Sequence, residues 1–430
     1  MPPSRSIKPV DGPVNGSIRP PGSKSITNRA LICAALADGV STLSGVLDSD
    51  DTRVMLDSLA KLGFSVSHDS DNCRVTIEGQ GGSIPNSSAK LEIGNSGTSV
   101  RFLTAMLGLA GGDYFIDGVE RMRERPIGPL VDALKQYGAS VEATSPGSCP
   151  PVLIKPDGTS SDAISVAGNL SSQYLSGLLM AAVQLEHDLK IGIEGRLVSL
   201  PYVSMTTEVM KSFGAAVEVD DLDGVPTSFL IRAGQSYSGC EYSIEPDASA
   251  ASYFFAIPAI VGGSATVLGL NADSLQGDVG FVRCLEQMGC DVRFGDDSIT
   301  VSGKAKAGID IDMANISDTV QTLASVALFV EGPTTIRNVA HNRVKETDRI
   351  GNLVIELRKL GVQVDEREDG LTIHPGPMNG ATFETYDDHR MAMSFALIGL
   401  QQRGIFVENP GCVSKTYPRY FEDLENFTTT

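Results

Sequence analysis

Six short polar segments, spaced evenly along the chain, carry most of the residues whose types could do chemistry. They are Ser23-Lys24-Ser25, Ser96-Gly97-Thr98, Ser171-Ser172-Gln173, Asp247-Ala248-Ser249, Asp318-Thr319 and Asp388-His389-Arg390. Each opens a run of Ala, Leu, Ile and Val that is too long for a strand, so we expect six apolar helices. The first turn of a helix has unpaired N–H groups and the positive end of the dipole, which attract phosphate and carboxylate. One opening is usually only a cap, but six in register predict a cleft for a ligand with several negative charges.

Positive charge is concentrated at these openings and in three nearby blocks. Lys24 lies at the first opening, and Arg29 follows just over one turn later in an otherwise apolar stretch. Arg125 ends a basic block before Pro126, where we expect an extended loop leading into a helix. The blocks are Arg121-Met122-Arg123-Glu124-Arg125, Arg343-Val344-Lys345-Glu346-Thr347-Asp348-Arg349, and Cys412-Val413-Ser414-Lys415-Thr416-Tyr417-Pro418. A solvated surface is the ordinary alternative for any one block. Lys345, Glu346 and Arg349 in one loop could instead bind an anion and move a proton.

Amphipathic helices that end at a glycine alternate with the apolar ones. These ends recur at nearly equal intervals, at Leu62-Gly63, Tyr137-Gly138, Phe213-Gly214, Met288-Gly289 and Leu360-Gly361. A sixth helix, expected over Tyr417–Phe427, closes the chain where a further strand would begin. The pattern predicts an α/β protein of six β-α-β-α-β-β modules, three in each of two domains. We place the first domain at 23–242 and the second at 243–430, which the N-terminal strand segment 1–22 joins.

The repeat could have a purely structural role, in which it serves only to build the fold. A purely structural repeat would keep its turns alike, whereas the six polar openings differ from one module to the next. That divergence favours a functional role for the openings.

Composition limits the possible partners. The chain has 430 residues, 41% of them apolar, and a formal net charge of −19, which disfavours nucleic acids and anionic membrane surfaces. Its seven cysteines form no zinc or C-x-x-C spacing, so we expect reduced thiols in a cytoplasmic protein without a metal. No run is long enough for a membrane span, and the longest is interrupted by Pro258. Dinucleotide, zinc-protease and α/β-hydrolase motifs are absent, and His389 is expected to be a structural hydrogen-bonding residue.

Five motifs together resemble the EPSP synthases of the enolpyruvyl transferase family, over the span from Arg19 to Leu424. They are Pro21-Gly22-Ser23-Lys24-Ser25, Gly94-Asn95-Ser96-Gly97-Thr98 with Arg101, Arg123-Glu124-Arg125-Pro126-Ile127-Gly128, Arg343-Val344-Lys345-Glu346-Thr347-Asp348-Arg349, and Asp388-His389-Arg390-Met391-Ala392-Met393. The resemblance implies a two-domain inside-out α/β barrel with helices inside, sheets outside and the active site in the interdomain cleft. It also implies transfer of the carboxyvinyl group of phosphoenolpyruvate to the 5-hydroxyl of 3-phosphoshikimate, with release of phosphate, in aromatic amino acid synthesis.

The resemblance also assigns the site. By analogy, 3-phosphoshikimate is held by Lys24, Ser25, Arg29, Ser171, Ser172, Gln173, Ser199, Tyr202, Asp318, Asn342 and Lys345. Phosphoenolpyruvate is held by Lys24, Gly97, Arg125, Gln173, Arg349, Arg390 and Lys415. Asp318 and Glu346 are the implied proton-transfer groups, with Lys24 as a further donor, and which carboxylate acts in which step stays open. No cofactor is expected, because phosphoenolpyruvate carries the reactive vinyl group, and we expect a monomer. Because Gly97 leaves room in the phosphoenolpyruvate pocket, we also expect sensitivity to glyphosate.

Two rivals remain, and a few positions depart from the commoner family pattern. UDP-N-acetylglucosamine enolpyruvyl transferases share the fold, but they usually carry a cysteine in the loop that corresponds to Gly118–Ile127, where this chain has none. A catalytically idle relative that binds a phosphorylated metabolite is the second rival, disfavoured by the intact set of charged residues. The departures are Phe102, Leu200, Ala314 and Ser317.

Overall fold

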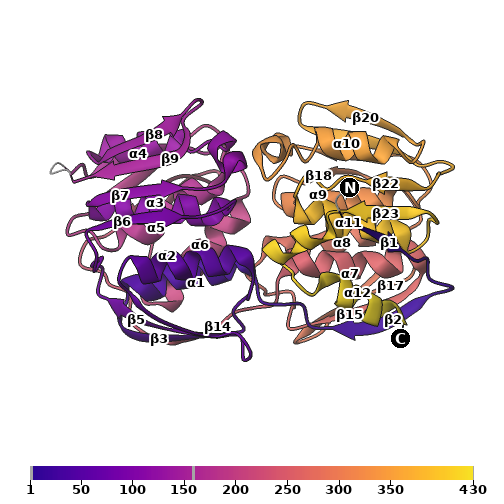
Figure 1. The fold of residues 1–430 in the computed structure, drawn as a ribbon, viewed down its shortest axis with the longest axis horizontal. Coiled ribbons are helices and arrows are strands. Elements are labelled where there is room, and N and C mark those ends of the chain that lie inside the picture. The colour runs from indigo at the N-terminus through magenta and orange to yellow at the C-terminus, as the bar shows by residue number, and fades with distance from the viewer. Residues whose placement is uncertain (1–2, 157–159, 430) are drawn as a thin grey trace. The chain divides into compact units, whose positions relative to one another are not determined.

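The computed structural model describes residues 3–156 and 160–429, and its chain forms two compact units (Figure 1). The N-terminal unit is one continuous segment, Gly22–Ile244. The C-terminal unit combines Met1–Pro21 with Glu245–Thr430. The chain therefore passes from one unit to the other twice.

The N-terminal unit contains three four-stranded sheets of one build. In each sheet two parallel strands are extended by an antiparallel hairpin, and in the second and third sheets a helix joins the two parallel strands. The orders are β14-β3-β5-β4, β6-β7-β9-β8 and β10-β11-β13-β12. The strands are β3 (Asp38–Ser44), β4 (Ser65–Asp69), β5 (Arg74–Gln80), β6 (Ser88–Glu92), β7 (Asp113–Asp117), β8 (Ser140–Ser145), β9 (Cys149–Lys155), β10 (Ala163–Ala167), β11 (Leu189–Glu194), β12 (Glu218–Leu222), β13 (Val225–Ile231) and β14 (Glu241–Ser243). This is the predicted β-α-β-α-β-β module, except that β14, from the end of the segment, supplies the first strand of the first module.

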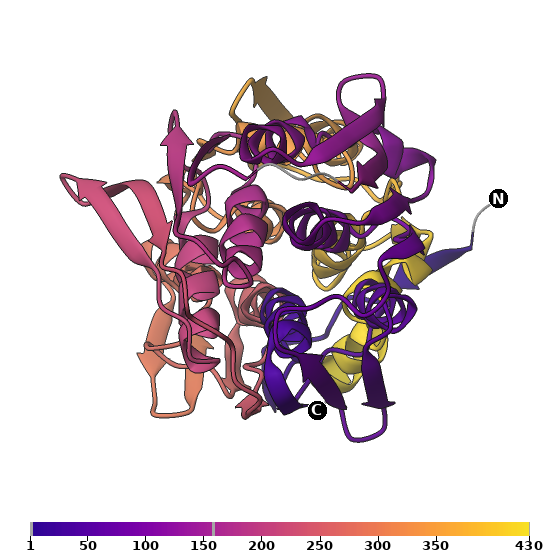
Figure 2. The same cartoon turned by 90° about the vertical axis from the view of Figure 1, so that its left-hand side faces the viewer.

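Helices fill the inside of this unit and the sheets lie on its outer side (Figure 2). The inner helices are α1 (Lys24–Leu36), α3 (Gly97–Ala110) and α5 (Ser172–Ala182), and the amphipathic ones are α2 (Asp50–Lys61), α4 (Gly128–Tyr137) and α6 (Leu200–Ser212). All residues of α1 from Ile26 to Leu36 are buried, which explains why its sequence is apolar on every side. The helix α2 instead buries one stripe, Met55, Leu56 and Leu59 among it, and ends before Gly63, whose φ of 93° suits a left-handed cap.

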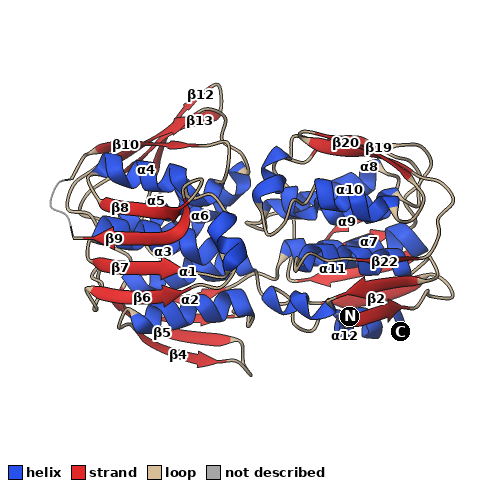
Figure 3. Ribbon diagram, turned by 45° about the horizontal axis from the view of Figure 1, so that its top comes forward, coloured by secondary structure: helices blue, strands red, loops and turns tan. Residues whose placement is uncertain are grey.

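The C-terminal unit repeats the plan with strands from both ends of the chain (Figure 3). Its sheets have the orders β16-β17-β15-β2, β18-β19-β21-β20 and β1-β23-β22. The strands are β1 (Ser4–Ile7), β2 (Val14–Ile18), β15 (Gly263–Leu268), β16 (Asp291–Phe294), β17 (Ser298–Ser302), β18 (Asp310–Asp312), β19 (Thr334–Arg337), β20 (Gln363–Arg367), β21 (Gly370–His374), β22 (Ala381–Phe383) and β23 (Ile405–Glu408). The strand β2 pairs with β15 in parallel, and β1 pairs antiparallel with β23, in the place that a hairpin strand takes in the other sheets.

The helices of this unit follow the same division. The inner ones are α7 (Ala248–Val261), α9 (Val320–Ala327) and α11 (His389–Gly399), and the others are α8 (Phe281–Gln287), α10 (Gly351–Arg358) and α12 (Tyr420–Thr429). Pro258 does not interrupt α7, which continues through it. The last helix begins at Tyr420 rather than Tyr417, because the Tyr417 N–H is bonded to the Val413 carbonyl of the preceding 3-10 turn. The expected class, two α/β units with helices inside and sheets outside, is confirmed. Among the described residues, no helix is both long and apolar enough to cross a membrane.

Candidate active site

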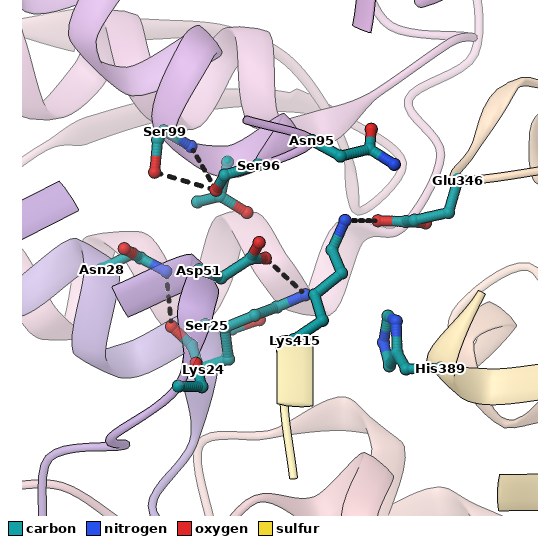
Figure 4. A network of polar contacts seen from close by, with 12 residues as sticks. Lys24, Ser25, Asn28, Asp51, Asn95, Ser96, Ser99, Glu346, His389 and Lys415 are labelled. Carbon is teal, nitrogen blue, oxygen red and sulfur yellow. Dashed lines mark hydrogen bonds and ion pairs between the residues drawn. The ribbon is translucent and has the colours of Figure 1, made fainter. Parts of the chain in front are cut away.

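The predicted site residues divide into two sets, one in each unit. In the N-terminal unit the opening of α1 is capped by Ser23, whose hydroxyl accepts from the Ile26 N–H. The ammonium of Lys24 lies 3.6 Å from the Asp51 carboxylate of α2, and the Asn28 amide donates to the Lys24 carbonyl at 3.1 Å. Figure 4 shows both contacts. The ion pair orients the side chain of Lys24 at the start of α1, whereas the Asn28 bond involves its backbone.

Arg29 is almost completely buried and its hydrogen-bond partners are neutral. Its guanidinium donates to the Thr206 hydroxyl at 2.7 Å, the Ser25 carbonyl at 2.8 Å, the Tyr202 carbonyl at 3.2 Å and the Ser176 hydroxyl at 3.3 Å. Burial lowers its pKa to about 10, so the group stays protonated at neutral pH. Arg29 therefore ties α1 to α5 and α6, and it forms no ion pair with a carboxylate among the described residues.

The opening of α3 brings Gly97 against Arg125. A Cβ atom on Gly97 would lie only 2.8 Å from the guanidinium carbon of Arg125, so a larger residue would displace that side chain. Arg125 is buried and donates to the carbonyl and the side-chain oxygen of Asn95 at 2.9 and 3.1 Å. Ser96 caps the helix through the Ser99 N–H (Figure 4).

The expected extended loop before Pro126 is wrong, because Glu120–Glu124 forms a 3-10 turn. The three arginines of this basic block also do not form one cluster. Arg121 pairs with Glu124 and Arg123 with Asp117, both at 2.6 Å, whereas Arg125 reaches the opening of α3. Ordinary local ion pairs thus account for two of the three arginines.

The opening of α5 is linked to that of α3. Ser171 caps α5, Ser172 is buried, and the Gln173 amide donates to the Thr98 hydroxyl at 3.1 Å. The Gln173 side-chain oxygen accepts from Arg101 at 2.5 Å. At the start of α6, Ser199 has a left-handed backbone with φ of 55°, and Tyr202 stacks near Arg29. The structure thus brings the predicted residues of this unit to neighbouring helix openings.

In the C-terminal unit, Asp318 accepts contacts from three cations. It lies in a 3-10 turn, Ser317–Thr319, just before α9. Its carboxylate is 2.6 Å from the Arg390 guanidinium, 3.3 Å from that of Arg349 and 3.9 Å from the Lys345 ammonium. Opposite charges at this range favour the ionised form of a carboxyl group. The arrangement suits a proton acceptor that is held in one orientation.

Glu346 lies on the other side of Arg349. Its carboxylate is 2.8 Å from the Arg349 guanidinium and 3.5 Å from the Lys415 ammonium, as Figure 4 shows for the lysine. Glu346 is 8% exposed and Lys415 is also buried, so both charges depend on one another for solvation. The two predicted carboxylates, Asp318 and Glu346, are therefore bridged by one guanidinium.

Asp388 anchors this network from the opening of α11. It is completely buried, accepts from Arg349 at 2.7 and 3.1 Å, and caps α11 by accepting from the Arg390 N–H at 2.9 Å. Burial lowers the pKa of Arg349, but Asp388, Glu346 and Asp318 outweigh it and raise the pKa overall. His389 lies beside this cap, with Nδ1 3.6 Å from Asp388. Asp388 thus holds two arginines in place at once.

The loop before Lys345 contains the last predicted residue, Asn342. Its amide donates to the Ser317 carbonyl at 2.9 Å, which ties the 3-10 turn Ala340–Val344 to the turn that carries Asp318. Ser317 therefore serves through its backbone. The neighbouring His341 is buried, and burial and the charge of Lys345 lower its pKa to about 4, against a smaller opposing effect of Asp318.

Three partners were missed by the sequence analysis as site residues. Asp51, Asn95 and Asp388 hold Lys24, Arg125 and Arg349 respectively. Asp388 and Asn95 each had a signal, their position in a motif at a helix opening, whereas Asp51 had none. Asp51 lies on a different helix from its partner, so the pairing depends on tertiary packing.

Metal ligation has no candidate in the part of the chain that the structure describes. No group of three or more His, Cys, Asp or Glu side chains there could hold a metal ion. The seven cysteines are free thiols, and five of them are buried.

The fold is that of the enolpyruvyl transferases. A solved EPSP synthase from Acinetobacter baumannii matches with a TM-score of 0.81 at 26% identity, over 98% of both chains. The enolpyruvyl transferase NikO from Streptomyces tendae matches with a TM-score of 0.76 over 99% of this chain and 98% of that one, and at 17% identity this likeness concerns the fold alone.

Sequence comparison narrows the class to one family. The family model for EPSP synthase (3-phosphoshikimate 1-carboxyvinyltransferase) matches residues 10–424. A 3-phosphoshikimate 1-carboxyvinyltransferase from Nostoc punctiforme is 46% identical over 96% of this chain and 97% of its own length. The chloroplastic enzyme of that name from Brassica napus is 45% identical over 96% of this chain and 83% of its own. The chain belongs to the EPSP synthase family.

Proposed function

We propose that this protein catalyses the reaction after which its family is named. The carboxyvinyl group of phosphoenolpyruvate is transferred to the 5-hydroxyl of 3-phosphoshikimate, with release of phosphate, on the route to chorismate and aromatic amino acids. The observation that carries this proposal is the cluster of Asp318, Glu346, Arg349, Arg390 and Lys415, in which a buried carboxylate (Glu346) and a partly buried one (Asp318) share one guanidinium. Such a cluster offers proton-transfer groups together with cations for an anionic substrate.

We assign the substrates by charge. Both carry a phosphate and a carboxylate, so they need cations and helix openings in number. For 3-phosphoshikimate we propose Lys24, Ser25, Arg29, Ser171, Ser172, Gln173, Ser199, Tyr202, Asp318, Asn342 and Lys345. For phosphoenolpyruvate we propose Lys24, Gly97, Arg125, Gln173, Arg349, Arg390 and Lys415. The unbalanced charge of Arg29 supports its role, since a buried cation with neutral partners gains most from an anionic ligand.

The chemistry consists of an addition and an elimination. In the addition, the oxygen of the 5-hydroxyl forms a bond to C2 of phosphoenolpyruvate, the hydroxyl proton leaves to a base, and the methylene carbon takes a proton to become a methyl group. In the elimination, the bond between C2 and the phosphate oxygen breaks and phosphate leaves with the electron pair. The methyl group then returns a proton, and the vinyl group is restored.

Three residues are proposed to move these protons. Asp318, held by two arginines, suits the base for the 5-hydroxyl, and Glu346 suits the exchange with the methylene carbon. Lys24 is a further donor at the opening of α1. The order in which the two carboxylates act is the part of the mechanism that the isosteric variants proposed below would separate.

The two sets of residues, one in each unit, are proposed to act on the same substrate pair. We further propose a monomer in the cytoplasm that needs no cofactor. Light scattering of the purified protein tests the monomer, and a mass of two chains would contradict it.

Phosphate release tests the activity. Incubation with phosphoenolpyruvate should release phosphate only when 3-phosphoshikimate is added. Release with UDP-N-acetylglucosamine instead would identify the rival transferase, and binding of either phosphorylated ligand without turnover would identify a sensor. Protein that has been treated with a metal chelator should be as active as untreated protein.

A further inference from the structure

One amide in the inner helices of the C-terminal unit has no hydrogen-bond partner. Gln321 on α9 is completely buried, and neither its side-chain oxygen nor its nitrogen is bonded to another of the described residues. An unsatisfied buried polar group costs about 1–3 kcal/mol of stability, so such groups are rare without a reason. An apolar residue would fit an inner helix at no such cost.

Two contacts fix where this amide lies. Asp318 precedes Gln321 by three residues and accepts from Arg390 on α11 at 2.6 Å. Ser325 follows by four residues, on the same face of α9, and donates to the Ser394 carbonyl on α11 at 2.8 Å. Arg390 and Ser394 are themselves four residues apart on α11. The side chain of Gln321 is therefore bracketed between α9 and α11, beside Arg390 and Ser394.

Further polar groups converge on the same place. The Ser394 hydroxyl is buried and unbonded within residues 3–156 and 160–429. The Tyr253 hydroxyl on α7 is also buried, and within that part of the chain it has no partner in good hydrogen-bond geometry, although the Arg390 side chain lies close enough to interact with it. Burial raises its pKa to about 12, and the charge of Arg390 opposes that shift, which places this hydroxyl near the guanidinium. A hydrogen bond between Ser252 and Thr322 closes α7 against α9 at 3.0 Å.

We propose that Gln321 is a positioning residue, which orients Arg390 through ordered water shared with the hydroxyls of Ser394 and Tyr253. A buried water typically makes two to four hydrogen bonds, which is what these groups offer. The amide accepts from one water and donates to another, so it can link a cation to neutral hydroxyls. A water-mediated bond is nearly as favourable as a direct one, so the bridge would hold the guanidinium in the orientation that binds phosphoenolpyruvate. The kinetic part of this inference rests on the proposed function.

The test replaces the amide with an apolar group of similar length. Gln321→Met should raise the KM for phosphoenolpyruvate roughly tenfold, with kcat changed by less than about threefold and the KM for 3-phosphoshikimate unchanged. The melting temperature should stay the same or rise, because a buried polar group is removed. Gln321→Leu should behave alike, so that the result does not depend on one side-chain shape. Gln184→Met, just beyond the C-terminal end of α5 in the N-terminal unit, replaces a partly buried glutamine whose amide nitrogen bonds the Met106 carbonyl; it is the control and should leave both KM values unchanged.

Two kinetic outcomes would overturn the inference. If the melting temperature rises and neither KM changes, Gln321 has no role in orienting Arg390. If kcat, both KM values and the melting temperature all worsen together, the side chain serves packing only.

A crystal structure provides a measurement that does not depend on activity. At a resolution that defines water, density should lie within hydrogen-bonding distance of the Gln321 amide and of the Ser394 or Tyr253 hydroxyl. A direct hydrogen bond from the Gln321 amide to another protein group, or no water density beside it, would contradict the proposed water bridge even if the wild-type protein is fully active. Conversely, an inactive wild-type protein with this water present would reject the proposed function and leave the bridge standing.

Discussion

The two units have equivalent helix openings, but their buried arginines have different kinds of partner. In the N-terminal unit, Arg29 and Arg101 are buried and hydrogen-bonded to neutral oxygen atoms. In the C-terminal unit, Arg349 and Arg390 are balanced by Asp318 and Asp388. An uncompensated cation gains from an anionic ligand, whereas a carboxylate among cations can exchange a proton. From this difference we propose that the N-terminal unit contributes mainly to binding and the C-terminal unit mainly to proton transfer.

The largest effect should come from the carboxylates of the C-terminal unit. Glu346→Gln keeps the shape but removes the proton-exchanging group, so kcat should fall by about 10²–10⁴-fold with a modest change in either KM. Asp318→Asn should behave in the same way, and the pH profiles of the two variants should differ if they act in different steps. Glu366→Gln, an exposed carboxylate paired with Arg343, is the control. Wild-type turnover in Glu346→Gln would remove that residue from the mechanism.

A binding residue of the N-terminal unit should show the opposite pattern. Arg29→Met removes a buried cation and should raise the KM for 3-phosphoshikimate by roughly 100-fold, while kcat at saturation changes much less. Steady-state kinetics with both substrates measures this. Arg53→Met removes an exposed, ion-paired arginine and should have no effect. A loss confined to kcat would reverse the division of labour between the units.

The opening of α3 should respond to a single methyl group. Because a Cβ at position 97 would crowd the Arg125 guanidinium, Gly97→Ala should raise the KM for phosphoenolpyruvate about tenfold and weaken inhibition by glyphosate more strongly. Inhibition curves for the wild type and the variant give both numbers. Gly12→Ala, where a Cβ meets open space, is the control. Equal glyphosate inhibition of the wild type and Gly97→Ala would contradict the proposed pocket.

The smallest effect concerns stability near neutral pH. The folded-state pKa of His341 is lowered to about 4 from 6.5, so its contribution to stability is present above pH 6.5 and is lost as the pH falls towards 4. Between pH 7 and pH 6 the free energy of unfolding should fall by about 0.7 kcal/mol on this account. Urea unfolding measures it, and His341→Gln should remove this part of the pH dependence. An unchanged slope in the variant would mean that His341 is protonated alike in both states.

Much of the fold could be predicted because periodic patterns report local structure directly. Apolar runs such as Ile26–Leu36 and helix ends such as Gly63 identify the modules without any knowledge of packing. The start of α12 could not be placed, since it depends on a hydrogen bond between Tyr417 and Val413.

Less of the candidate site could be predicted from such sequence patterns. The sequence showed Lys24 and Asp318 and their positions at helix openings. The Lys24–Asp51 pair and the burial of Gln321 could not be predicted, because they depend on contacts between different helices. The basic block at residues 121–125 was a poor indicator of the site, because Arg121 and Arg123 pair with acidic residues close in sequence. The roles of the individual residues stay predictions until the variants are measured.

The pairing of β1 with β23 and of β2 with β15 has a consequence for how the protein is made. During translation the N-terminal unit, Gly22–Ile244, leaves the ribosome with all its strands and can fold at once. The two strands synthesised before it have no partners until Gly263–Leu268 and Ile405–Glu408 emerge. The strands β1 and β2 must therefore wait for these partners, and the C-terminal unit can be completed only after β23 has been synthesised.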